Sequence, residues 1–256
     1  MTSYLPKGTL PEGLCLFWTH LLDMFTHARE TSSEEISPGV EQRTLVSSKD
    51  TSYQVLNVKL LTIDPKMETD PVEVNEERIY FFLDGRGTAS LRWLKALWRH
   101  PVRADTVLWI PSLRHQIKNC GDATLRCLVV ACKTKDNVDD RYVFPVIRDA
   151  RMLPSMAYVG GSEVFIFTPG SLGSGSKFNY CGTATTYGGS STDPHVPTDQ
   201  CEETIYVTRG EGIITVGDEK RSVEPGSLAY VPRGTLHCEQ NVGQELLEYV
   251  IFENHD

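Results

Sequence analysis

The stretch GSLAYVPRGTLHCEQN, residues 226–241, decides the fold of this chain. It reads as a short apolar strand that is interrupted at Pro232 and Gly234 and followed by His237 and Asn241. Proline fixes φ and glycine tolerates positive φ, so this pair bends the backbone sharply. The bend predicts that His237 is aimed away from the strand axis and into a site.

A second segment, residues 188–212 (GGSSTDPHVPTDQCEETIYVTRGEG), supplies partners for that histidine. Side chains alternate along a strand, so Glu203 shares a face with Ile205 and Val207. A carboxylate on an apolar face is costly unless it is paired or bound to a cation. The sequence therefore predicts that Glu203 is paired with another group or holds a cation.

The two halves of the chain resemble each other, which indicates a duplicated β unit. RIYFFLDGRGTA (78–89) precedes ADTVLWIPSLRHQIKN (104–119) in the first half, and TIYVTRGEGIIT (204–215) precedes PGSLAYVPRGTLHCEQN (225–241) in the second. Short strands at close spacing favour an all-β sandwich or barrel. LRWLKALWRH (91–100) has helical periodicity, but the duplication predicts two strands joined near Lys95.

Residues 226–241 match the second cupin motif, G-x5-P-x-G-x2-H-x3-N, at every defined position. Residues 188–212 resemble the first cupin motif through Glu203, Gly210 and one histidine, His195, while Pro197 stands where a second histidine is expected. The stretch before Glu203 is one residue longer than usual, so Glu202 is an alternative carboxylate. Asp199 and Cys201 are candidate replacements for the missing histidine.

The resemblance implies two tandem antiparallel, jelly-roll-like barrels, a bicupin. The expected domains are a helical or irregular extension over 1–42, a degenerate barrel over 43–135, a connector over 136–157 and a metal-binding barrel over 158–256. A packed amphipathic helix is expected over 14–25. His20 and His27 share its face, and a surface position is favoured over a ligand role for both.

The N-terminal copy departs further from the motifs. It has no histidine before Glu77, Arg78 falls where the carboxylate is expected, and its later segment keeps Pro111, His115 and Asn119 without the glycine. His115 with a nearby glutamate (Glu73, Glu76 or Glu77) could form a site, but a structural role for His115 is the preferred interpretation.

The resemblance implies a divalent metal in the second barrel, held by His195, Glu203 and His237. Two histidines and one carboxylate leave open positions on a metal, which suits Fe, Mn, Ni or Zn. The resemblance implies a metal-dependent enzyme acting on a small organic molecule, with non-haem oxygenase chemistry preferred. The alternatives are an isomerase, lyase or amidohydrolase of a carboxylate-like substrate, or a non-catalytic ligand-binding or storage bicupin. Tyr180 and Tyr187 are candidate general acids, although packing roles are common for such tyrosines.

Composition excludes some partners. The 256-residue chain has a net charge of −9 (25 Lys and Arg, 34 Asp and Glu), which argues against nucleic acid or an anionic membrane. Its seven cysteines form no CxxC pair, and the N-terminal sequence lacks secretory-signal features, so reduced thiols and a cytoplasmic location are expected. A homodimer is also anticipated.

Overall fold

The computed structural model describes residues 24–51, 56–72, 76–93, 95–133, 144–168, 172, 176–197 and 201–255. Nearly all of these residues lie in antiparallel strands or the turns between them, and no α-helix occurs in the described part. The helix expected over 14–25 falls outside it except for its end, where Phe25 starts a strand. None of the described helical segments is long and apolar enough to cross a membrane.

The N-terminal unit consists of a seven-stranded sheet in the order β11-β8-β5-β10-β4-β3-β2 and a three-stranded sheet in the order β7-β6-β9. Its strands are β2 (Ser33–Ser37), β3 (Val40–Val46), β4 (Leu56–Ile63), β5 (Glu76–Asp84), β6 (Arg86–Trp93), β7 (Ala96–Arg103), β8 (Thr106–Ile110), β9 (His115–Asn119), β10 (Leu125–Lys133) and β11 (Val146–Asp149).

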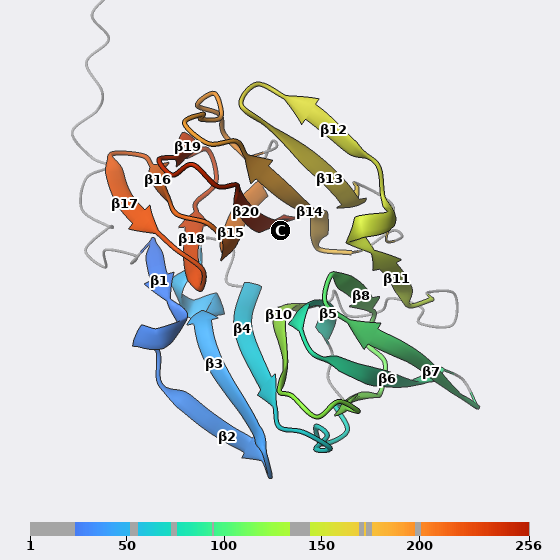
Figure 1. Cartoon of the computed structure of the whole chain (residues 1–256). Helices are drawn as coiled ribbons and strands as arrows, with labels where there is room; N and C mark the ends of the chain where they lie inside the picture. The colour runs from blue at the N-terminus through green and yellow to red at the C-terminus, as the bar shows by residue number, and fades with distance from the viewer. Residues whose placement is uncertain are drawn as a thin grey trace, which may run out of the picture.

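The C-terminal unit repeats this plan, with a seven-stranded sheet in the order β1-β18-β15-β20-β14-β13-β12 and a three-stranded sheet in the order β17-β16-β19 (Figure 1). Its strands are β1 (Phe25–His27), β12 (Ser155–Tyr158), β13 (Gly161–Phe167), β14 (Phe178–Thr186), β15 (Cys201–Arg209), β16 (Gly212–Val216), β17 (Glu219–Val223), β18 (Ser227–Val231), β19 (His237–Asn241) and β20 (Leu247–His255).

The two units exchange their first strands. β1 comes from the start of the described chain but pairs with β18 of the C-terminal unit, and β11 pairs with β8 of the N-terminal unit. A short 3-10 turn follows each of them, η1 (Ala28–Glu30) after β1 and η4 (Ala150–Met152) after β11. The duplication therefore begins at β1. Residues 24–42 form β1, β2 and the start of β3 instead of an irregular extension, and 144–157 contain β11 and β12 instead of a plain connector.

The segment with helical periodicity, 91–100, forms two strands as the duplication predicts. β6 and β7 make a hairpin in which Leu91 pairs with Trp98 and Trp93 with Ala96. Leu91 is fully buried while its cross-strand partner Trp98 is 41% exposed, so β6 packs inside the barrel and β7 lies at the solvent edge of the sheet. Tertiary pairing has overridden local helical propensity here.

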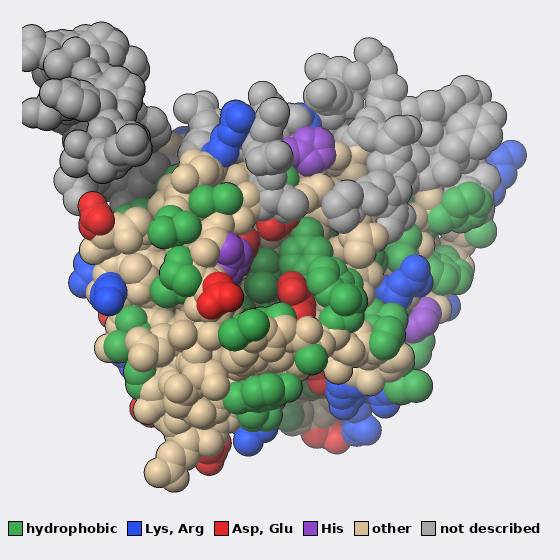
Figure 2. All heavy atoms as spheres, turned by 90° about the horizontal axis from the view of Figure 1, so that it is seen from above, with side chains coloured by type: hydrophobic (Ala, Val, Ile, Leu, Met, Phe, Trp, Pro, Cys, Tyr) green, Lys and Arg blue, Asp and Glu red, His purple; other side chains and the backbone are tan. Residues whose placement is uncertain are grey.

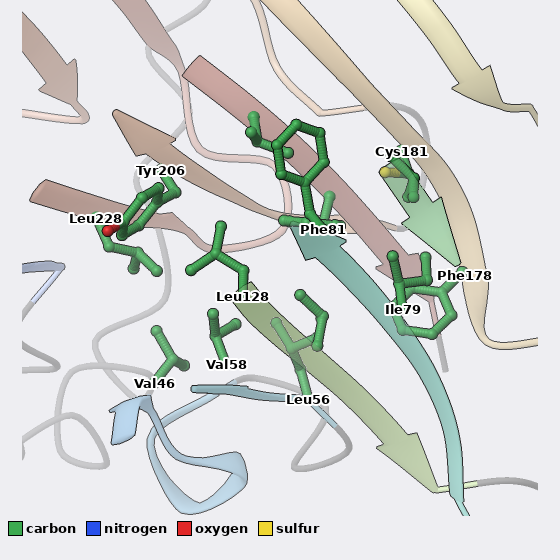
Figure 3. Close-up of a cluster of buried hydrophobic side chains, with 14 of the residues drawn as sticks. Val46, Leu56, Val58, Ile79, Phe81, Leu128, Phe178, Cys181, Tyr206 and Leu228 are labelled. Atoms are coloured by element: carbon green, nitrogen blue, oxygen red, sulfur yellow. The ribbon is translucent and has the colours of Figure 1, made fainter. Parts of the chain in front are cut away.

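The principal hydrophobic core lies between the two large sheets. Val46, Leu56, Val58, Ile79, Phe81 and Leu128 from the N-terminal unit face Phe178, Cys181, Tyr206 and Leu228 from the C-terminal unit (Figure 3). Each barrel also has an apolar interior of its own. Because alternate residues of each large-sheet strand face the partner unit, the remaining residues face into the barrel, where a site can form.

A third short turn, η2 (Ser48–Asp50), follows β3. None of the six described cysteines forms a disulfide with another. Four of them, Cys127, Cys132, Cys181 and Cys201, are buried, and burial raises the pKa of Cys127, Cys132 and Cys181 above the ordinary value. These thiols behave as small apolar core groups.

Candidate metal centre in the C-terminal barrel

The turn between β18 and β19 directs His237 into the barrel. Thr235 donates its backbone N–H to the Pro232 carbonyl at 3.0 Å, and Gly234 has φ of +69°. A side chain other than glycine is strained at that φ, so the proline and glycine of the motif fix the bend. His237 then begins β19 and is 1% exposed.

His195 reaches the same place through a backbone bridge to His237. The N–H of each residue donates to the carbonyl of the other, at 3.0 and 2.8 Å. The two imidazole rings are 4.1 Å apart between centroids, with planes inclined by 51°. The Nδ1 of His195 lies 2.9 Å from the carbonyl of Asp193, which can only accept, so Nδ1 carries the proton and Nε2 is left to ligate.

Glu203 lies on the inner face of β15, as the alternation predicted. Ile205 and Val207 belong to the barrel interior, whereas Tyr206 belongs to the core between the sheets. The Oε1 atom of Glu203 is 3.4 Å from Nε2 of His237, and the residue is 3% exposed. The three predicted residues are therefore adjacent.

Glu202 faces the opposite way and is excluded from the centre by its contacts. Its carboxylate accepts hydrogen bonds from the hydroxyl of Tyr230 at 2.5 Å and from the amide of Asn254 at 2.8 Å. Of the proposed replacements for the missing histidine, Cys201 is a buried thiol two residues before Glu203 that does not line the cavity, and Asp199 lies outside the described residues.

A fourth group in the centre, Glu239, was missed by the motif comparison. It follows His237 by two residues on β19, and its Oε1 is 3.7 Å from Nε2 of His237. Thr192 fixes the carboxylate, because its hydroxyl donates to Glu239 Oε2 at 2.8 Å. The sequence HCEQN contained the signal, because residues two apart on a strand share a face and Glu239 therefore lies on the same face as His237.

His195, Glu203 and Glu239 line a cavity of about 620 Å³ at the barrel mouth. Three further acidic residues, Glu163, Asp193 and Glu253, also line it, and no Lys or Arg does so among the described residues. In the space-filling view, acidic and histidine side chains gather around a hollow among apolar side chains (Figure 2). The mouth therefore concentrates negative charge on an apolar floor.

Burial shifts the titration of these groups. It raises the pKa of Glu203 to about 8, with Glu253 adding like-charge repulsion, and it also raises the pKa of Glu239. Burial lowers the pKa of His237. A divalent cation would reverse this balance, because it favours ionised carboxylates and neutral imidazoles.

The donor atoms fit a cation in chemistry and burial. Both ring nitrogens of His237 and the Oε1 of Glu239 are buried with no hydrogen-bond partner among the described residues. Within that same part of the chain, no three such side chains stand as a ready-made coordination sphere. Binding would therefore require the imidazoles, now 4.1 Å apart, and the two carboxylates to turn toward a common point.

Of the two tyrosines expected as acids, Tyr180 lines the cavity and Tyr187 does not. The hydroxyl of Tyr180 donates a short hydrogen bond to Glu163, and burial raises the pKa of both groups. Tyr187 is 46% exposed and lies outside the cavity wall, because the loop after β14 turns it toward solvent. A role for Tyr187 at this site is therefore not supported.

His27 is not part of the centre. His20 lies outside the described residues. His27 caps η1, since its Nδ1 accepts from the N–H of Arg29, and its Nε2 is 3.6 Å from Glu224.

Comparison with known proteins agrees with this architecture. Residues 184–253 match a family model described as a cupin domain. An uncharacterized protein of Streptomyces coelicolor, SCO3923, is 38% identical over 61 residues, which cover 24% of this chain and 57% of that protein. The match thus spans a little over half of that relative.

Solved structures share the fold of both units. A mutant of Bacillus subtilis oxalate decarboxylase superposes with a TM-score of 0.76 at 13% identity, covering 91% of this chain and 78% of that one. Lactobacillus farciminis oxalate decarboxylase in a formate complex gives 0.74 at 11% identity, covering 91% and 86%. Two barrels of one plan in tandem account for the duplicated sequence, the exchanged first strands and these superpositions, and residues 184–253 of the second barrel are similar to a cupin domain.

Proposed function

We propose that the C-terminal barrel is the active site of a metal-dependent enzyme acting on a small organic molecule. The observation that carries this proposal is a group of two imidazoles and two carboxylates. His195, Glu203 and Glu239 line a 620 Å³ cavity, and the buried His237 contacts both carboxylates. Several carboxylates buried together are costly without a cation. The rival interpretation is a cupin barrel that has lost its metal and only binds or stores a ligand.

Oxygen-rich ligand sets with imidazole suit manganese or iron among the predicted metals. One of the structural neighbours is reported for its Mn(II) centres. When bound, such a metal would supply Lewis acidity and a template for the substrate. His195, Glu203, His237 and Glu239 would hold it, and Thr192 would orient Glu239.

The electrostatics of the mouth favour a neutral, oxygen-bearing substrate over a dianion. Glu163 and Glu253 stand at the mouth in addition to the two carboxylate ligands, and no cationic side chain of the described residues faces them. A dicarboxylate such as oxalate would meet repulsion at close range. The substrate of the structural neighbours is therefore not carried over to this chain.

The pair Glu163 and Tyr180 favours acid–base chemistry at this site. Burial raises the pKa of Glu163, and the Tyr180 hydroxyl donates to it, so the carboxyl is held at the cavity wall with its pKa displaced toward neutrality. Such a group can exchange a proton with a bound substrate. Isomerase, lyase and hydrolase reactions use such a proton-transfer group, whereas dioxygen activation needs no protein group beyond the metal ligands. We accordingly place isomerase, lyase or hydrolase chemistry ahead of dioxygen activation.

Metal analysis tests the proposal. Protein purified without added metal should contain close to one manganese or iron per chain, and His237→Ala should lose it. Cys238→Ser, at the next position on the outer face of β19, is the matched control and should retain the metal. No metal in the wild type after loading with Mn, Fe, Ni or Zn would establish the ligand-binding alternative instead.

A second experiment separates the reaction types. Glu163→Gln should keep the metal and lose exchange of substrate hydrogen with solvent deuterium, while Asn179→Asp, at a residue that binds Glu253 instead, should change exchange much less. Oxygen uptake that persists in Glu163→Gln would favour the oxygenase.

A further inference from the structure

The mouth of the N-terminal barrel holds a second cavity of about 420 Å³. It lies at the position that the metal centre occupies in the other barrel, and its volume is in the range that accommodates small ligands. Its polar wall is made by Ser37, Gln42, Asn57, Lys59, Arg78 and Tyr80.

Strand pairing identifies the counterpart of each residue in the two mouths. Arg78 pairs with Ala131 and Ile110, as Glu203 pairs with Glu253 and Val231. Gln42 pairs with Leu61 as Glu163 pairs with Ala184. Four glutamates of the C-terminal mouth thus have counterparts that are not acidic. Gln42 corresponds to Glu163, Arg78 to Glu203, Ile117 to Glu239 and Ala131 to Glu253.

A metal cannot occupy the N-terminal mouth in the same way. Val72 takes the place of His195, because it makes the same backbone bridge, here to His115. The remaining histidine is already hydrogen-bonded at both nitrogens, to the Tyr80 hydroxyl at 2.6 Å and the Leu113 carbonyl at 2.6 Å.

The mouth contains two cationic side chains, Lys59 and Arg78, beside two acidic ones, Glu76 and Asp70. Lys59 stands where the other barrel has Gly182, opposite Val129 as Gly182 is opposite Ile251, and its Nζ contacts Gln42 at 3.3 Å. Glu76 pairs with one end of the Arg78 guanidinium at 3.2 Å. Asp70 also lines the cavity but is exposed to solvent, where its charge is screened.

Two hydrogen-bond donors of the wall are unused. The Nε of Arg78 and the hydroxyl of Ser37 are buried without a partner among the described residues, and Ser37 is 8% exposed. Buried donors without an acceptor are costly, so they point to a ligand that accepts hydrogen bonds. Guanidinium, ammonium and amide groups together recognise a carboxylate.

We propose that the N-terminal barrel binds a small organic carboxylate between Arg78 and Lys59, with Gln42 and Asn57 as further donors. The duplication has turned one copy into a cation centre and the other into an anion site. This proposal does not depend on the reaction of the C-terminal barrel, since neither cation belongs to that mouth.

Calorimetric titration of the full chain tests it. Malonate or succinate, added to the His237→Ala variant so that no metal can recruit the anion, should bind with a Kd below ~1 mM. Lys59→Gln and Arg78→Gln should each weaken binding by ~10-fold or more, because each removes a charge-assisted hydrogen bond. Lys118→Gln, an exposed lysine of the same barrel, is the control and should bind as the parent does.

Three outcomes would overturn the proposal. They are no saturable binding of either dicarboxylate, binding by Lys59→Gln and Arg78→Gln that is as tight as binding by the parent, or tighter binding of phosphate or sulfate than of any carboxylate. If Arg78→Gln does not fold, Lys59→Gln carries the test, since Lys59 is half-buried and its ammonium group donates to the side-chain oxygen of Gln42.

Discussion

The two barrels share a backbone and differ in what their mouths can bind. Asn119 and Asn241 illustrate the shared part, because each amide donates to two backbone carbonyls and each Oδ1 accepts from a glycine N–H two residues later. Thr69 and Thr192 likewise accept from the N–H at the matching position of β9 and β19. These shared hydrogen bonds hold the backbone of each barrel in place.

The site residues, in contrast, are exchanged one by one. His195, Glu203 and Glu239 correspond to Val72, Arg78 and Ile117, while the common histidine is retained in both copies. In the N-terminal copy, the Tyr80 hydroxyl forms a hydrogen bond with Nε2 of this histidine, His115. The ring nitrogens of His237 have no hydrogen-bond partner among the described residues. A conserved scaffold position thus says little about function until the side chains across the barrel are known.

The strongest way to break the comparison is to give the C-terminal mouth the residues of the other copy. We expect Glu203→Arg with Glu239→Ile to abolish metal binding completely, because a fixed cation replaces two ligands. Metal content by mass spectrometry and far-ultraviolet circular dichroism check this. Glu211→Arg, at an exposed position, should leave the metal in place; retention of metal in the double variant would refute the assigned ligands.

His115 should make stability depend on pH. Burial lowers its pKa from 6.5 to about 4. Between pH 6.5 and 4, His115 is protonated in the unfolded chain and neutral in the folded chain. The free energy of unfolding therefore decreases by about 3 kcal/mol as the pH falls through this window. Urea unfolding of wild type and His115→Gln at several pH values measures this. A difference between them that is constant with pH would contradict it.

The paired asparagines sharpen the shared side of the comparison. Asn119→Ala and Asn241→Ala should each lower the free energy of unfolding by about 2 kcal/mol, since each leaves buried backbone groups unsatisfied. Chemical denaturation of both variants is the measurement. If only Asn241→Ala lowered the free energy of unfolding, the two asparagines would not share a structural role.

The smallest expected effect separates the two threonines. Thr192 also donates to Glu239, so Thr192→Val should weaken metal affinity by ~10-fold. Thr69→Val removes the matching backbone contact in the other barrel and should leave affinity unchanged. Metal titration into chelator-treated protein compares them, and equal affinities would show that Thr192 does not orient the ligand.

Sequence alone determined the duplication, the all-β fold and the location of the candidate centre. Strand alternation placed Glu203 on the inner face, and the proline–glycine bend aimed His237 inward, because both depend on local geometry. The resemblance added the barrel and the histidine at 195. The cytoplasmic location and the homodimer stay predictions.

Only the tertiary structure decided what lies across the barrel. Pairing between strands distant in sequence decided the exchange of β1 and β11 and the exclusion of Glu202 and Tyr187. It also brought Glu163, Glu239 and Glu253 to one mouth and two cations to the other. Local propensity and motif spacing carry no information on such contacts, since the register of non-local strands is set by how whole sheets pack.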